Sequence, residues 1–435
     1  MDDTNDVKKT VEGINHAGDY GTTPVPIGSR KGIFSLSMVT AGFTISMSGL
    51  FTGAALAQGL SLRNAIIANI LGNIIICLYS GSIAAIGAKY GVSASMLSRE
   101  AFGRKGAKII GLIIAITLTG WYSAQCGFFG QTINTLFPNG GFLTSVRVAA
   151  LWGGILMMLT AIFGFKGLQY LSNFGIPILI AVSAYGIYLS VGNVGNGQMT
   201  FNVNTPITLV QGVVMAVGSF AVGGVIQADI SRYARSIKDS WISTGVGFLF
   251  GNIFIISAGI IMIKATGDGN LPSAMVKVGL GGLGLFVLMI AQWTTNDNNL
   301  YSSSLGILHL IPNVKKSTIT AILGAVATLI GAAGFYIYFI PFLTTLGSII
   351  PPIAGVIIAD YYLIKKKYDF SKDAKYASWN ISSFISIILG ALVGIYVKQG
   401  ISSVNAIASA LITQYILIKL FNDKLIIPSS ITKSE

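Results

Sequence analysis

The stretch that decides the fold is AGFTISMSG at residues 41–49, near the middle of an apolar segment that covers residues 33–59. Glycine and serine hold a helix together poorly. Backbone groups freed at membrane depth are tolerated only where they line a cavity or find other partners. We therefore predict a membrane helix that is broken at its centre. A stretch of the same kind, GSFAVGG at residues 218–224, interrupts the apolar segment 206–231.

Apolar segments recur along the whole chain, and the two broken ones are the first and the sixth of twelve. Each is long enough to cross about 30 Å of hydrocarbon. The segments cover residues 33–59, 64–88, 106–135, 147–165, 168–191, 206–231, 240–264, 274–308, 318–336, 338–363, 378–397 and 401–421.

The spacing of the two breaks predicts an internal repeat. Each unit has five helices, and because five is odd, the second unit must have the opposite orientation in the membrane. We therefore expect an all-α membrane protein with two inverted repeats, at about residues 31–191 and 206–363, around a central site. Residues 1–30 would form a tail, and residues 364–435 two peripheral helices with a C-terminal tail. The alternative is that both glycine-rich stretches are packing faces between helices.

The composition supports a membrane protein. Of the 435 residues, 53% are hydrophobic and 10% are charged, and the mean hydropathy is +0.73. Soluble domains carry about 25% charged residues. Residues 1–30 are polar and contain Pro24 and Pro26, so we expect a tail there rather than a cleavable signal.

Basic residues set the expected orientation. With both termini in the cytoplasm, most of the 28 lysines and arginines lie on the cytoplasmic side, as the positive-inside rule requires. The exceptions are Arg63, Arg147, Lys264, Lys277 and Lys398. We therefore expect a multi-pass protein of the cell membrane with cytoplasmic termini. The net charge of +13 follows from this asymmetry, and nucleic acid is not an expected partner.

A polar run, QWTTNDNN at residues 292–299, lies inside another apolar segment. Such a run persists at membrane depth where it faces a water-filled path, a bound ion or a neighbouring helix. Thr294 and Thr295 supply uncharged, hard oxygen donors, which suit a weakly held monovalent cation. The alternative is hydrogen bonding between packed helices. For Asp297, both a role with protons or cations and an inter-helix hydrogen bond remain open.

An aromatic ring and an amide share one face of the segment 106–135. Trp121 lies near its middle, and Gln125 follows one helical turn later. Phe220, in the second break, could supply an opposing ring. A ring to stack on and an amide that both donates and accepts suit a small planar heterocycle. The alternative is that both rings are packing residues.

Other classes of membrane protein fit the sequence poorly. Cys77 and Cys126 have no metal-ligand spacing and are expected to be packing residues. The sequence offers neither the nucleophile with its base nor the metal cluster that an embedded enzyme needs. It has no repeated filter for a channel and no phosphate-binding loop for an ATP-driven pump.

Several short segments together carry a family pattern. They are RKG at 30–32, GAKYG at 87–91, GW at 120–121, GSF at 218–220, AD at 228–229, WTTNDN at 293–298 and PPIAGVIIADY at 351–361. Over roughly residues 24–420 the chain resembles the nucleobase:cation symporter-1 family, particularly its cytosine permeases. The resemblance implies a leucine-transporter-like fold with broken helices 1 and 6, and Na⁺-coupled uptake of nucleobases or related heterocycles across the lipid bilayer.

The resemblance also implies roles for individual residues. For sodium it implies backbone carbonyls and hydroxyls at Gly42, Ile45 or Ser46, Ala291, Thr294 and Thr295. For the substrate it implies stacking on Trp121 and Phe220 and backbone contacts at Gly218 and Ser219. Na⁺ would be the coupling ion, and no other cofactor is expected.

The chain departs from the cytosine permeases at the positions that read the edge of the substrate. Where those permeases carry glutamine, serine and asparagine, this sequence has Leu118, Val222 and Ala291. Gln125 instead resembles the pattern of hydantoin and allantoin transporters in the family. Other polar candidates for substrate binding are Asn296 and Gln227. The expected function is thus symport of a nucleobase or related cyclic amide; H⁺ coupling, or an amino-acid substrate, is the alternative.

Overall fold

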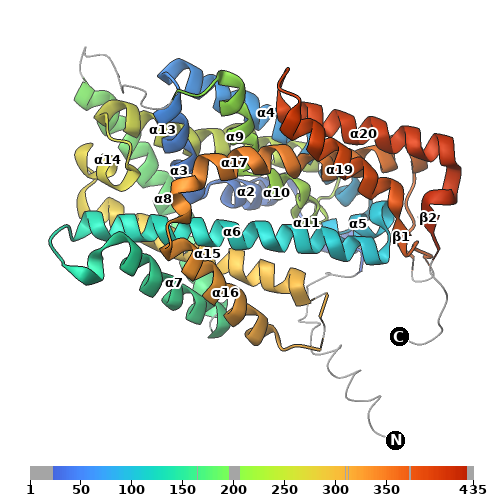
Figure 1. Cartoon of the computed structure of the whole chain (residues 1–435), viewed down its shortest axis with the longest axis horizontal. Coiled ribbons are helices and arrows are strands. Elements are labelled where there is room, and N and C mark those ends of the chain that lie inside the picture. Colours follow the sequence, from blue (N-terminus) through green and yellow to red (C-terminus); the bar gives the residue numbers. More distant parts are fainter. Residues whose placement is uncertain are drawn as a thin grey trace, which may run out of the picture.

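The computed structural model describes residues 23–163, 165–194, 206–308, 310–311, 313–371 and 374–428. Most of the expected N-terminal tail and the last residues of the C-terminal tail lie outside this part of the chain. The described residues are almost entirely helical, and most helices run along the long axis of the molecule (Figure 1).

The first half of the core follows the order expected from the sequence. After a short 3₁₀ turn, η1 (Ile27–Ser29), come a bent pair and four long helices, with η2 (Phe142–Thr144) before the third of these. The bent pair and the long helices are α2 (Ile33–Thr44) with α3 (Met47–Gly59), α4 (Leu62–Tyr90), α6 (Arg104–Leu136), α7 (Val146–Phe163) and α8 (Phe165–Val194).

The second half repeats this order. Its elements are α9 (Leu209–Ser219) with α10 (Ala221–Val225) and α11 (Ala228–Ser231), α12 (Ile237–Gly245) joined by the π-helix η3 (Val246–Asn252) to α13 (Ile253–Thr266), α15 (Gly281–Leu308), α16 (Lys316–Ala332), and a last span made of η4 (Phe335–Tyr338), α17 (Phe339–Ile349), α18 (Pro351–Ile358) and η5 (Ala359–Lys365).

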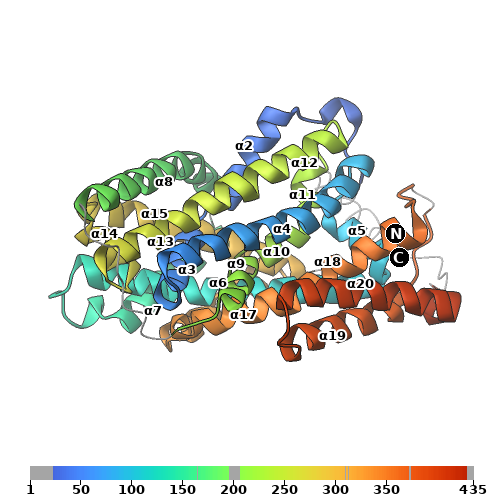
Figure 2. The same ribbon diagram turned by 90° about the horizontal axis from the view of Figure 1, so that it is seen from above.

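Two peripheral helices complete the described chain, α19 (Ile381–Tyr396) and α20 (Ser402–Phe421). They pack against each other and against α17 and α18 (Figure 2). A short antiparallel pair, β1 (Trp379–Asn380) and β2 (Ile426–Ile427), ties their two ends together. The 3₁₀ helix η6 (Asn422–Leu425) leads into β2.

Both predicted breaks are present. The pair α2 and α3 bends by 53°, and α9 bends by 59° against the stretch Ala221–Ser231. The first break falls on Ile45 and Ser46, whose ψ angles of 86° and 156° are not helical. The second falls on Phe220, with φ −136° and ψ 21°. The prediction that the first and sixth spans are broken is therefore confirmed.

Two short helices mark the inverted relation of the halves. In the first half, α5 (Ala94–Phe102) lies between the second and third spans, and in the second half α14 (Leu271–Lys277) lies at the equivalent place. They sit at opposite ends of the molecule (Figure 1). An element that recurs at the same place in the order but at the other end is what inversion requires.

Length and apolarity agree with a protein that crosses a membrane many times. Among the described residues, six helices are long and apolar enough to cross, or eight when each bent pair counts as one span. Shorter apolar helices cover Val146–Ile162, Lys316–Ala332 and Ile381–Tyr396. The remaining span, α15, has 28 residues but contains the polar run 292–299.

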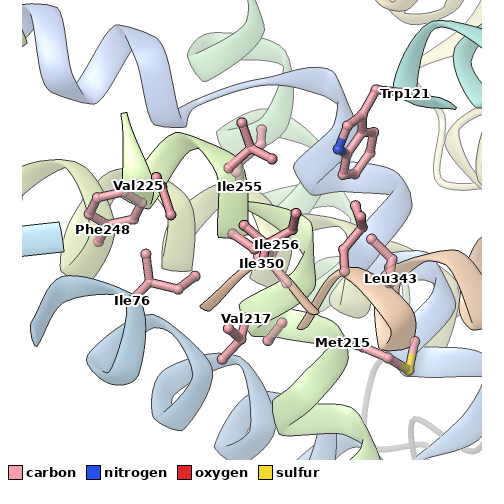
Figure 3. Close-up of a cluster of buried hydrophobic side chains, with 14 of the residues drawn as sticks. Ile76, Trp121, Met215, Val217, Val225, Phe248, Ile255, Ile256, Leu343 and Ile350 are labelled. Carbon is pink, nitrogen blue, oxygen red and sulfur yellow. The ribbon is translucent and has the colours of Figure 1, made fainter. Parts of the chain in front are cut away.

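The core lies between the two bent pairs and the helices that surround them. Figure 3 shows Ile76 from α4, Val217 from α9, Ile256 from α13 and Ile350 from the junction of α17 and α18 gathered in one cluster. These side chains are fully or almost fully buried. Small residues bring the backbones close: the Cα of Gly53 in α3 packs directly against the carbonyl of Ile256 in α13.

A chain of buried asparagines joins α4 to the seventh span. Asn252 Nδ2 donates to Asn73 Oδ1 at 2.7 Å, and Asn73 Nδ2 donates to Asn69 Oδ1 at 2.8 Å. Asn69 Nδ2 donates onward to the carbonyl of Ile253 at 3.0 Å. Satisfied buried polar chains fix the relative position of the groups they connect. These two spans are thus held together as one unit beside the site.

Candidate functional site

A cavity of about 250 Å³ lies where the two breaks meet. Its walls come from α2 and α3, α6, α8, the break between α9 and α10, and α15. The residues at the first break that line it are Gly42, Phe43, Ile45, Ser46, Met47 and Ser48. The break thus lies at a cavity, as the sequence predicted, so its unpaired backbone groups face the cavity rather than lipid.

Aromatic rings form part of the wall. Trp121 lines the cavity, is 7% exposed and packs edge-on against Phe339 and Phe342, with ring centroids 5.7 and 5.4 Å away. Phe220 also lines the cavity. Its ring meets Phe43 edge-on at 4.9 Å. Both rings are held at their edges by other rings, so their orientation is fixed before any ligand enters.

Gln125 is a fully buried polar side chain in the cavity wall that has no hydrogen-bond partner. The side chain is 0% exposed to solvent, it lines the cavity, and neither Nε2 nor Oε1 has a hydrogen-bond partner. Leaving a buried donor or acceptor unpaired costs about 1–3 kcal/mol. A buried amide with both functions free, one turn after Trp121, is therefore poised to bind a ligand that can both accept and donate.

All six residues implied for the cation line this cavity: Gly42, Ile45, Ser46, Ala291, Thr294 and Thr295. Thr294 Oγ1 and Thr295 Oγ1 each donate to the carbonyl of Ala291, at 3.1 and 2.8 Å. Because the hydroxyl protons point at that carbonyl, the lone pairs of both oxygens stay free for a cation. The C-terminal end of α2, where carbonyls lack helical partners, carries partial negative charge that favours the same ligand.

The polar run 292–299 divides between two faces of α15. Thr294, Thr295, Asn298 and Asn299 line the cavity, and the other members pack against α6 and α7. Their contacts are Gln292 Nε2 to Thr132 Oγ1 at 3.2 Å, Trp293 Nε1 to Thr160 Oγ1 at 2.9 Å, Asn296 Nδ2 to the carbonyl of Tyr122 at 3.3 Å, and Thr160 Oγ1 to Asp297 Oδ2 at 3.0 Å. One face of the run thus lines the cavity, and the other face hydrogen-bonds to neighbouring helices.

Substitution of Thr160 should affect stability and not ligand binding. Its hydroxyl accepts a hydrogen bond from Trp293 and donates to Asp297, which is 3% exposed. Thr160→Val should lower the free energy of unfolding by about 1–3 kcal/mol, because it leaves the buried carboxylate of Asp297 and the partly buried indole N–H of Trp293 without this partner. The melting temperature of the purified protein measures the loss. Ligand affinity should stay within about twofold; a larger change in affinity would mean that this face also takes part in binding.

Three other candidate residues lie away from the cavity walls. The Cα of Gly218 packs against the carbonyl of Leu343 in α17, and Asn296 faces α6 as described. Gln227 is fully buried, and its Nε2 lies 3.4 Å from Thr244 Oγ1. Ser219, in contrast, lines the cavity. Substrate binding by these residues stays a prediction.

The structure also adds residues to the walls that were not singled out. Ser48 lines the cavity, and its Oγ lies 2.7 Å from Ser46 Oγ. Ile176 and Leu179 form a wall on α8, and nothing in their local sequence distinguishes them from lipid-facing residues. Ser302 lines the cavity as well. It stands two turns after Thr294 on the same face, so helical spacing could have found it.

An aromatic layer lies next to the cavity. It consists of Phe51 from α3, Phe128 from α6 and Phe339 from α17. Phe51 and Phe128 stack at 3.8 Å between ring centroids, with planes 11° apart, and Phe128 meets Phe339 edge-on at 4.9 Å. All three rings are at least 95% buried. None of the three rings lines the cavity, but Phe51 and Phe128 lie one helical turn beyond Ser48 and Gln125, which do, and the cavity extends along α15 to Ser302.

Comparison with known proteins gives the family. A family model described as permease for cytosine/purines, uracil, thiamine, allantoin matches residues 26–417. The cytosine permease of Escherichia coli strain K12 is 30% identical over 413 residues, which make up 94% of this chain and 97% of that protein.

Solved structures give the same fold. The inward-facing conformation of Mhp1 matches with a TM-score of 0.82 at 18% identity, over 94% of this chain and 95% of that one. Mhp1 in a closed conformation with bromovinylhydantoin bound, described as a nucleobase-cation-symport-1 family transporter, matches with a TM-score of 0.74 at 17% identity, over 92% and 95%. The predicted fold class and family are confirmed. The chain is a multi-pass membrane transporter rather than an enzyme, and it belongs to the family of permeases for cytosine and purines, uracil, thiamine and allantoin.

Proposed function

We propose that this permease is a Na⁺-coupled symporter that takes up a cyclic amide by alternating access across the cell membrane. The observation that carries the proposal is the amide of Gln125, which is buried, has no hydrogen-bond partner at Nε2 or Oε1, and lines the same cavity as Trp121. The cytosine permease of Escherichia coli and the hydantoin-bound relative support a flat, nitrogen-rich heterocycle as the substrate.

The side-chain amide of Gln125 determines which hydrogen-bonding groups the substrate should carry on its edge. Gln125 can donate from Nε2 to a ring carbonyl and accept a ring N–H at Oε1, which matches an adjacent C=O and N–H pair. Uracil, hypoxanthine, allantoin and hydantoin carry such a pair. Leu118, Val222 and Ala291 line the same cavity with apolar side chains. Cytosine remains a close competitor because the relative of 30% identity is a cytosine permease.

Sodium is the coupling ion that the oxygen donors favour. Thr294 and Thr295 offer neutral hydroxyls, and the end of α2 offers backbone carbonyls, a set that suits a hard monovalent cation. In the described residues no group of three histidines, cysteines or carboxylates could hold a heavier metal. The buried carboxylate of Asp297 faces Thr160 on the packed side of α15, which speaks against it as the primary proton carrier of the cavity.

The arrangement of the cavity walls suits alternating access. The aromatic layer lies on the side of the cavity toward the end of the molecule where α14 lies, and polar residues of α15 line the cavity toward the end where α5 lies (Figure 1). Lys89 at the end of α4 and Arg104 at the start of α6 lie at this second end. By the positive-inside rule it is the cytoplasmic end. The described conformation is then the one that faces the cytoplasm.

A thermal-shift screen tests the proposal as a whole. Purified protein is heated with cytosine, uracil, hypoxanthine, adenine, allantoin or hydantoin, in Na⁺ or in K⁺. A ligand at 100 times its Kd stabilises the folded state by about 2.7 kcal/mol. We expect the largest rise in melting temperature with a ring that carries adjacent C=O and N–H groups, and a larger rise in Na⁺ than in K⁺. Equal shifts in both salts would contradict sodium coupling.

Gln125→Leu separates substrate reading from cation binding. In this variant the polar edge of the bound substrate has no hydrogen-bond partner at position 125. The binding free energy should therefore weaken by about 1–3 kcal/mol, which is roughly a tenfold to hundredfold loss of substrate affinity. Na⁺ affinity measured without substrate should stay near wild type. Gln414→Leu is the matched control, because it removes a fully buried amide of α20 that does not line the cavity. Full retention of substrate affinity in Gln125→Leu would assign the reading to another residue.

A further inference from the structure

We propose that Asn298 and Ser302 form a release path that carries the cation from Thr294 and Thr295 toward the far end of α15. The proposal rests on the proposed sodium coupling and adds to it a second set of residues, which act after the cation has left its site. Their role is to lower the barrier for departure, and they are not needed for the affinity of the bound cation.

The geometry of α15 places these residues in a row. Thr294, Asn298 and Ser302 are spaced four residues apart and so share one helix face, with about 6 Å of rise between neighbours. All three line the cavity, and so does Asn299 beside them. Asn298 and Ser302 are exposed within the cavity. The row therefore leads from the cation donors along the polar side of the cavity, away from the aromatic layer.

The lack of protein partners distinguishes this row from the rest of α15. In the part of the chain that the structure describes, the side chains of Asn298, Asn299 and Ser302 make no hydrogen bond. The polar residues on the opposite face, Gln292 and Asn296, are held by α6. Polar side chains are costly at membrane depth and persist where they meet water or an ion. Hydrogen bonds to α6 account for the polar residues on the packed face. They do not account for the polar residues of the row.

The neighbouring wall on α8 offers a departing cation no side-chain oxygen. Gly175, Ile176 and Leu179 of α8, together with Phe43 of α2, line the same cavity, and none of them has a polar side chain. A cation that leaves two threonine hydroxyls must replace its lost donors at once, because departure is fast only when the next site also binds it. Asn298 Oδ1 and Ser302 Oγ supply neutral oxygens at successive steps.

The test compares net uptake with exchange in proteoliposomes that contain the full-length protein. Net uptake requires the cation to leave on the inside, whereas substrate exchange with saturating Na⁺ on both sides lets it stay bound. We expect Asn298→Leu and Asn298→Leu with Ser302→Ala to slow net uptake about tenfold. Exchange and the Kd for Na⁺ should stay within about twofold of wild type.

Ser303→Ala is the matched control, because Ser303 is buried on the packed face and donates to the carbonyl of Leu300. It should leave both modes unchanged. Wild-type rates of net uptake in the double variant, or net uptake and exchange that fall together, would overturn the release path. Failure of the underlying coupling is distinguishable, because wild-type net uptake would then be equal in Na⁺ and K⁺.

Discussion

Thr295→Val is expected to lower Na⁺-dependent uptake by roughly tenfold or more when Na⁺ is below saturation. Valine keeps the shape of the side chain but removes an oxygen whose proton is directed at the carbonyl of Ala291, 2.8 Å away, and whose lone pairs are free. Loss of one donor from a small neutral set should weaken Na⁺ binding by roughly tenfold or more, about 1.4 kcal/mol. Uptake of labelled substrate against external Na⁺, with K⁺ as replacement, measures the effect.

The control for this variant is Thr119→Val. Thr119 on α6 also donates to a carbonyl within its own helix, that of Ala115 at 2.8 Å, but does not line the cavity. It should retain wild-type Na⁺ activation. If both Thr294→Val and Thr295→Val keep unaltered Na⁺ activation with normal expression, the cation does not bind at these hydroxyls.

Trp121→Ala should weaken substrate binding by roughly tenfold to a hundredfold or more. Stacking of a base on an aromatic side chain contributes about 1–3 kcal/mol in other systems. Edge-on contacts with Phe339 and Phe342 fix the orientation of the Trp121 ring. Trp121→Phe keeps a smaller ring and should have a milder effect. The Kd from binding titrations is the measurement.

A tryptophan outside the cavity provides the comparison. Trp152 packs edge-on against Phe129, and its indole N–H donates to the carbonyl of Leu143 at 3.0 Å. Trp152→Ala should leave the Kd of the folded protein unchanged. A Kd for Trp121→Ala within about twofold of wild type would make Trp121 a packing residue.

The architecture was accessible from sequence because its signals are local. Glycine and serine at 41–49 and 218–224 mark the breaks, which the structure places at Ile45 and Phe220. The length of each apolar segment is fixed by the thickness of the bilayer, so the spans could be read in order. The π-helix η3 (Val246–Asn252) could not be predicted, because residues 240–264 are apolar on almost all sides, and such a segment has no one-sided pattern in which the extra residue would show.

The site was accessible only in part, because its geometry depends on contacts distant in sequence. The period of α15 shows that Thr294 and Asn296 point in different directions, but not which of them faces the cavity. Gln227 looks as suitable as Gln125 until Thr244 is found beside it. The aromatic layer joins rings from three separate helices, and no local pattern connects Phe51 to Phe339.

The aromatic layer also determines where the membrane voltage acts. A cavity of about 250 Å³ with a polar wall has room for several waters, and a water-filled space conducts ions, so little of the voltage falls along it. Most of the electric field is then concentrated across the rings of Phe51, Phe128 and Phe339. A unit charge that crosses 100 mV exchanges about 2.3 kcal/mol with the field. In the proposed symport, a cation at Thr295 would already have crossed this drop, so its departure along α15 would move little charge through the field. Most of the charge movement would then accompany the opening and closing of the rings.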